Sequence, residues 1–128
     1  MIARARGRGL YDALEAADAT AYLTRSAQAF DCIVAGDALP YFGDLEPLFA
    51  ACRRALIDAG LIAFSIETFK GDGFRLGPTM RFFHARAYVE QTAGASRLGP
   101  LLVRPGRIRR EAGVEAPGLI CVFEARDR

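Results

Sequence analysis

The sequence predicts an α/β domain with a mostly parallel sheet, helices on both faces and an antiparallel strand pair at the carboxyl end. Residues 30–37 and 61–67 are short apolar runs, as expected for strands buried on both faces. A helical pattern lies between them, and strand, helix and strand in so short a span indicate a right-handed crossover between parallel strands. Two later apolar runs, joined by the turn-rich residues 111–118, predict the antiparallel pair.

The helix between the two predicted strands has the clearest local signals. Asp44 is a candidate cap, and Pro47 lies in the first turn, where a missing N–H group costs nothing. Residues 58–60, Asp-Ala-Gly, supply a stop signal. The apolar residues of this segment share one stripe: Leu45, Leu48, Phe49, Cys52 and Leu56.

The remaining segments are assigned from the same kinds of pattern. Residues 1–14 are helix-like but have no capping residue in front of them. Residues 69–80 are rich in glycine and lack periodicity, which predicts a long loop of the kind that borders a site. A helix is predicted over 85–93, and strands over 101–103, with extension through 110 left open, and over 119–125.

Composition indicates one soluble domain, residues 1–128, in the cytoplasm. Hydrophobic residues make up 52% of the 128 residues and charged residues 25%, which is typical of a folded globular protein. No apolar run approaches the roughly 18 residues that cross a bilayer. A net charge of +2 does not indicate nucleic acid, although the segment 104–110 contains four arginines that we interpret as a solvated strand face.

Cysteine and histidine usage gives no indication of a metal site. Cys32, Cys52 and Cys121 are widely separated among apolar neighbours, so we expect buried thiols rather than disulfides. His84 is the only histidine, and no cysteine pair has the spacing of zinc ligands.

The carboxyl ends of the two predicted parallel strands are the positions where an open sheet binds ligands. They correspond to residues 37–41 and 67–70, and an acid, Asp37 or Glu67, stands at each. A carboxylate there either accepts hydrogen bonds from a ligand or caps a neighbouring helix, and the sequence leaves both interpretations open.

Two further pairs of side chains are candidates for chemistry. His84 and Tyr88 are four residues apart, and on one helix face they would form an acid–base pair, although a cap or surface role suits a lone histidine equally. Arg75 and Arg81 flank the glycine-rich loop and are candidates for binding the carboxylate or phosphate of a substrate, unless they are simply solvated.

Several of these segments, in this order, resemble class I S-adenosylmethionine-dependent methyltransferases, especially bacterial ones linked to tetratricopeptide repeats. The segment 1–14 resembles the helix after the family's second strand, and 30–42 resembles its fourth strand and the following turn. Residues 55–61 keep one glycine, Gly60, of a longer family motif. Residues 73–78, followed by Arg81, His84 and Tyr88, resemble the signature of the subgroup.

The resemblance implies S-adenosylmethionine as cofactor. Asp18 and Ala19 would lie at its adenine end, and Asp37, Ala38 and Leu39 at its methionine end. The family's glycine-rich loop and ribose-binding acid have no counterpart in this sequence, so the resemblance also implies an amino-terminally truncated domain.

The function implied is methyl transfer to a small-molecule or protein acceptor by in-line displacement, which depends mainly on positioning. The alternative is an inactive remnant or an interaction module that binds no cofactor. A dinucleotide dehydrogenase is less well supported because no G-x-G-x-x-G motif is present. Truncation would also leave residues 30–36 with an unpaired edge, for which we expect cover by residues 14–18, by the first helix or by a second copy of the chain.

Overall fold

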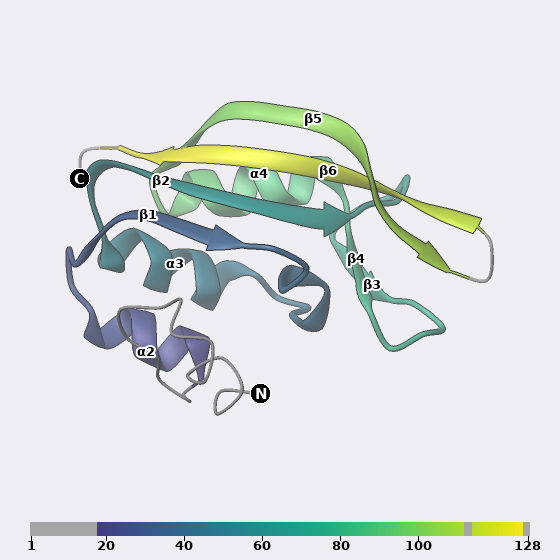
Figure 1. Ribbon diagram of the computed structural model, residues 1–128, viewed down its shortest axis with the longest axis horizontal. Helices are drawn as coiled ribbons and strands as arrows, with labels where there is room; N and C mark the ends of the chain where they lie inside the picture. Colours follow the sequence, from purple (N-terminus) through teal and green to yellow (C-terminus); the bar gives the residue numbers. More distant parts are fainter. Residues whose placement is uncertain (1–17, 112–113, 127–128) are drawn as a thin grey trace, which may run out of the picture.

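The computed structural model describes residues 18–111 and 114–126, and it forms a single sheet with helices packed beside it (Figure 1). The helix predicted over residues 1–14 lies outside the described residues. In chain order the elements are α2 (Ala19–Arg25), β1 (Phe30–Ala35), the 3₁₀ helix η1 (Leu39–Tyr41), α3 (Glu46–Ala55), β2 (Leu56–Glu67), β3 (Phe74–Leu76), β4 (Phe82–His84), α4 (Arg86–Ala95), β5 (Leu98–Glu111) and β6 (Val114–Ala125).

The sheet has six strands and is mixed. β2 lies at its centre, parallel to β1 and β4 and antiparallel to β6, while β3 with β4 and β5 with β6 form antiparallel pairs. The predicted α/β class and the antiparallel carboxyl-terminal pair are confirmed. The prediction of a mostly parallel sheet is wrong, because three of the five strand pairings are antiparallel. β3 with β4 and β5 with β6 are pairs of consecutive strands, which a short connection leaves antiparallel, and β6 then runs antiparallel to β2 as well.

The two edges of β2 have different neighbours. β6 occupies one edge along residues 61–67, so β1 and β4 both lie on the other edge. β1 pairs with β2 from Leu56 to Phe64, and β4 joins at Glu67, beyond the end of β1. This arrangement brings the residues that follow β1 next to those that precede β4.

α3 and α4 pack on the same face of the sheet and share one core with it. The rings of Phe49 on α3 and Phe64 on β2 lie 5.5 Å apart, and Phe64 stacks on Phe123 of β6 at 5.6 Å. α2 packs on α3 (Figure 1). Within residues 18–111 and 114–126 the helices thus lie on one side of the sheet. The helix predicted over 1–14 lies outside these residues, so helices on both faces stay a prediction. The buried core includes Leu48, Phe49 and Cys52 of α3, Val89 and Ala93 of α4, Ile62, Phe64 and Ile66 of β2, and Leu119, Cys121 and Phe123 of β6.

The opposite face of the sheet is more exposed. Val34 on β1 is 74% exposed and Cys32 is also exposed. The predicted burial of β1 on both faces is therefore wrong, as is the predicted burial of the Cys32 thiol. Cys52 of α3 and Cys121 of β6 are buried, and desolvation raises the pKa of each thiol to about 12. The exposed Cys32 and the buried Cys121 thus lie on opposite faces of the sheet.

Local signals placed the start of α3 better than its end. Pro47 lies in its first turn, as predicted. The cap position is Leu45, one residue after the predicted Asp44, although the Asp44 carboxylate still accepts from the backbone N–H of Glu46 at 3.0 Å. The helix ends at Ala55, however, and β2 begins at Leu56, before the predicted stop at residues 58–60. Those residues instead belong to β2, with Ala59 in the left-handed region at φ 65°.

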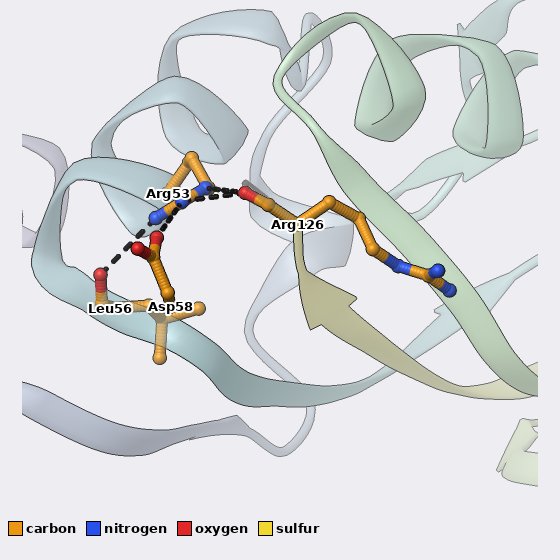
Figure 2. Close-up of polar contacts among 4 residues, drawn as sticks. All are labelled: Arg53, Leu56, Asp58 and Arg126. Carbon is orange, nitrogen blue, oxygen red and sulfur yellow. Dashed lines mark hydrogen bonds and ion pairs between the residues drawn. The ribbon is translucent and has the colours of Figure 1, made fainter. Parts of the chain in front are cut away.

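Arg53 ties the amino end of β2 to the carboxyl end of β6 (Figure 2). Its guanidinium donates to the carbonyl oxygens of Arg126, at 2.6 and 3.1 Å, and Leu56, at 3.3 Å, and it pairs with the Asp58 carboxylate. The side chain is buried, so these acceptors replace the water that it loses. No helix in the part of the chain that the structure describes is long and apolar enough to cross a membrane.

Candidate functional site

A cavity of about 260 Å³ lies between α2 and β1 and contains three of the five residues predicted to bind a cofactor. Those three are Ala19, at the start of α2, and Ala38 and Leu39, at the start of η1. The surroundings are mainly apolar, with Leu23, Ile33, Phe42, Leu48, Cys52 and Ile62 among the other lining residues. The cavity can therefore take a flat apolar group far more readily than a charged one.

Asp18 stands beside this cavity as the cap of α2. Its Oδ2 accepts a hydrogen bond from the backbone N–H of Ala21 at 2.9 Å, and the residue is exposed. This contact explains why the helix begins at Ala19, since the carboxylate satisfies one of its unpaired N–H groups. A cap and a cofactor contact are compatible uses of one carboxylate, which has two oxygens.

Asp37 is not among the residues that line the cavity, and its carboxylate binds Arg81. The Asp37 carboxylate accepts from Arg81 Nη2 at 2.5 Å, and the Glu67 carboxylate accepts from Arg81 Nε at 2.7 Å. Tyr41 completes the set, because its hydroxyl accepts from Nη1 at 3.2 Å and its ring centre lies 5.2 Å from the guanidinium carbon. The two acids predicted at neighbouring strand ends do lie together, joined by this arginine.

Arg81 is engaged within the protein. Its side chain is 3% exposed, and each of its three nitrogens has a protein acceptor. Burial lowers the pKa of the guanidinium, but the hydrogen bonds to Asp37 and Glu67 outweigh it, so the pKa lies above its ordinary value. The predicted role of Arg81 in binding a substrate anion would compete with these bonds.

His84 and Tyr88 lie side by side, although they do not share a helix. His84 ends β4, Tyr88 belongs to α4, and their rings stack with centres 6.2 Å apart. His84 Nε2 lies 2.7 Å from the carbonyl oxygen of Phe42 and 3.1 Å from that of Gly43. Nδ1 is buried with no hydrogen-bond partner. Burial lowers the pKa of the imidazole, so it stays neutral at pH 7 and donates from Nε2 to these carbonyls.

Tyr88 holds the same loop from its other end. Its hydroxyl accepts from the backbone N–H of Leu45 at 2.9 Å and lies 3.2 Å from Asp44 Oδ1. Burial raises the pKa of the phenol above its ordinary value. Both side chains thus fix residues 42–45 before α3, and this arrangement favours a structural role over the predicted acid–base role.

The loop predicted over residues 69–80 contains the short hairpin strand β3. Arg75 on β3 is exposed, and its guanidinium carbon lies 4.9 Å from the ring centre of Phe69 and 5.7 Å from that of Phe83. Its predicted role in substrate binding stays a prediction.

A second cavity, of about 440 Å³, lies elsewhere and is a weaker candidate. Arg53, Arg54 and Arg97 line it between the carboxyl ends of α3 and α4. Figure 2 shows Arg53 already bound to Arg126, Leu56 and Asp58. Cations near helix carboxyl ends are stabilising in their own right, so these arginines are explained without a ligand.

Some residues of this region had no signal in the sequence. Leu23 and Phe42 line the cavity, but in the sequence they look like any core residue. Tyr41 and Glu67 were within the segments singled out at the strand ends, yet nothing indicated that both would meet Arg81. Among the described residues, no three His, Cys, Asp or Glu side chains are grouped as a metal ion would require.

Over nearly its whole length the chain is structurally similar to S-adenosylmethionine-dependent methyltransferases. It matches such an enzyme from Methanosarcina mazei with a TM-score of 0.73 and 12% identity, covering 98% of this chain and 76% of that one. The 1,6-didemethyltoxoflavin-N1-methyltransferase of Burkholderia thailandensis, whose structure contains S-adenosylhomocysteine, matches with a TM-score of 0.59 and 15% identity, covering 79% and 46%. The [4+2]-cyclase SpnF matches with a TM-score of 0.77 and 15% identity, covering 98% and 61%.

These identities establish the fold and no more. The presence of a cyclase beside methyltransferases illustrates that one fold hosts different reactions. The chain spans 46 to 76% of the length of these three structures. No protein-family model matches the sequence. No curated protein matches it either.

Proposed function

We propose that the chain binds S-adenosylmethionine in the cavity between α2 and β1 and serves in methyl transfer to a small-molecule or protein acceptor. The observation that carries the proposal is the convergence of Ala19, Ala38 and Leu39 on one apolar cavity. Three residues from two separate segments, predicted from the sequence, line the same space.

The chemistry of the cavity suits the adenine end of this cofactor, where Ala19 is expected. Ala38 and Leu39, expected at the methionine end, line the same cavity, so in this proposal they lie near the adenine end instead. The apolar walls of the cavity, which include the buried Leu39, would contact the faces of a flat ring that has left water. Asp18 at the start of α2 supplies a carboxylate, the acceptor that an exocyclic amine needs. The volume of about 260 Å³ accommodates a part of the cofactor rather than the whole molecule.

The proposal does not require His84 or Tyr88 to act as acid or base. Methyl transfer by in-line displacement gains most of its acceleration from holding donor and acceptor in position. The proposal extends to the subgroup linked to tetratricopeptide repeats, on the strength of residues 73–78 with Arg81, His84 and Tyr88.

Titration with S-adenosylhomocysteine, followed by two-dimensional NMR, tests the proposal. We expect shifts centred on Ala19, Ala38 and Leu39, with a dissociation constant weaker than about 1 μM, or less than roughly 8 kcal/mol of binding free energy. Replacing Ala19 by Phe fills the cavity and should abolish the shifts. The control is Ala21→Phe, since Ala21 is exposed on the same helix but does not line the cavity.

A second candidate, an interaction module without cofactor, is favoured by the exposed apolar residues of β1. Val34 and Cys32 lie on the sheet face opposite α3 and α4. If millimolar S-adenosylhomocysteine moves no resonance of the wild-type chain, the cofactor proposal fails and this candidate replaces it.

A further inference from the structure

Arg81 joins three segments at the carboxyl ends of β1 and β2. Its acceptors are Glu67, the last residue of β2, Asp37, which follows β1, and Tyr41 of η1. Two of these acceptors lie on either side of Ala38 and Leu39, which line the cavity. The arginine therefore holds both ends of the turn that forms one cavity wall.

That turn contains a backbone conformation that is unfavourable without support. Asp37 has φ 53°, in the left-handed region that most residues with a side chain avoid. Aspartate adopts this region more readily than most residues, and here the distant Arg81 binds its carboxylate and supports the conformation.

The two carboxylates that bind Arg81 differ in their surroundings. Glu67 is 2% exposed at its side chain and fixes the guanidinium, whereas the Asp37 side chain is 62% exposed. The buried ion pair with Glu67 thus fixes the position of Arg81, and the bond to Asp37 connects Arg81 to the turn. Solvent competes for the exposed Asp37 carboxylate, so this carboxylate can be removed while Arg81 stays paired with Glu67.

We propose that Arg81 is a positioning residue for the cavity, holding the turn of residues 37–41 so that Ala38 and Leu39 meet the ligand. This inference rests on the proposed function. Arg81 itself does not line the cavity, and its effect on affinity passes through Asp37 and Tyr41.

The test measures S-adenosylhomocysteine affinity and amide exchange in the same variants of the full chain. Asp37→Ala removes the bond between Arg81 and the turn but keeps the buried pair of Arg81 with Glu67, so we expect binding to weaken about threefold to tenfold. The amides of residues 38–42 should exchange faster, and those of β2 should not. Asp37→Asn keeps an acceptor and tolerates the left-handed region, so it should restore most of both properties.

Glu90→Ala is the matched control. It removes the acid of another partly exposed arginine–carboxylate pair, Arg86 with Glu90, on α4. Affinity and exchange in the turn should stay at wild-type values. Arg81→Lys keeps the charge but replaces the planar guanidinium, and an intermediate loss is expected.

The outcomes separate this inference from the proposed function. Wild-type binding with unchanged affinity and unchanged exchange in Asp37→Ala would overturn the positioning role alone. If Asp37→Asn is as impaired as Asp37→Ala, charge rather than turn geometry matters, and the inference is wrong. A wild-type chain that binds nothing would overturn the proposed function and this inference with it.

Discussion

Arg53 and Arg81 are both buried arginines that join separate segments, at the two ends of the same strand. Arg53 binds the carbonyl of Leu56, the first residue of β2, and Arg81 binds Glu67, the last. Arg53 satisfies mainly neutral backbone carbonyls, which occur at every helix and strand end. Arg81 is placed between two carboxylates and beside a cavity. The two arginines are similarly buried and make similar numbers of hydrogen bonds, so they differ mainly in the chemical type of their acceptors.

The comparison shows that the cost of removing a buried arginine depends on whether its partners are neutral carbonyls or carboxylates. Without Arg53, the Arg126 carbonyl can accept a hydrogen bond from water instead, because Arg126 is itself exposed. Glu67 has no such alternative, since its side chain is almost fully buried. At the amino end of β2, Arg53 therefore mainly links backbone segments. At the carboxyl end, stability depends on the pairing of Arg81 with the buried Glu67 carboxylate.

The largest expected effect is on stability at the Arg81 end. Arg81→Gln leaves Glu67 buried without its cation, and we expect a loss of about 3–5 kcal/mol in the free energy of unfolding. Arg53→Gln removes bonds to carbonyls and to the exposed Asp58, and a loss of about 1.5–3 kcal/mol is expected. Urea unfolding of the two variants measures the difference. Equal losses, or a larger loss for Arg53→Gln, would contradict the comparison.

A smaller effect concerns His84, which fixes the loop before α3 at the Arg81 end. Burial lowers the pKa of His84 in the folded chain, so the unfolded chain binds a proton more readily. The stability that His84 contributes is thus complete above pH 6.5 and falls as pH drops below that value, by up to about 1.4 kcal/mol per pH unit. Thermal unfolding at pH 7.5 and 5.5 tests this.

His84→Gln provides the comparison for that measurement. Glutamine retains an N–H donor for Phe42 but does not titrate, so the variant should lose less stability between pH 7.5 and 5.5 than the wild type does. The same pH dependence in both proteins would show that the imidazole is not the group responsible.

The smallest effect on stability is expected at β1, which neither arginine contacts. Among the described residues, β1 pairs with β2 alone, and Val34 is 74% exposed beside the other edge. We propose that this edge supports a homodimer, and Val34→Lys should reduce self-association in light scattering with under about 0.5 kcal/mol change in unfolding free energy. Leu76→Lys, at an exposed site on β3, is the control. A wild-type chain that stays monomeric at high concentration would contradict this proposal.

Local patterns predicted the elements better than their limits. The start of α3 followed from Pro47 and Asp44, and α4 from a clear helical segment, because capping and periodicity act within a few residues. The end of α3 was misplaced, since Leu56 fits a helical stripe and a buried strand equally well. The short strand β3 carried no signal of its own in a glycine-rich segment.

The candidate site was predicted in its location and only partly in its contacts. Ala19, Ala38 and Leu39 do line one cavity, whereas Asp37 turns toward Arg81. The direction of the Asp37 side chain depends on its backbone angle, φ 53°. Composition and spacing do not reveal that an aspartate adopts this left-handed conformation. The burial of His84 was missed for a similar reason, because its partners Phe42 and Gly43 lie more than 40 residues away.

The sequence by itself determined the α/β class, the βαβ unit and the antiparallel end pair, because hydrophobic periodicity and turn residues act locally. Only the tertiary structure decided that the sheet is mixed, that α3 and α4 share one face, and that one edge of β2 holds both β1 and β4. The last of these brings Asp37 and Arg81 together. Strand order and face are set by packing between distant segments, and no local pattern carries that information.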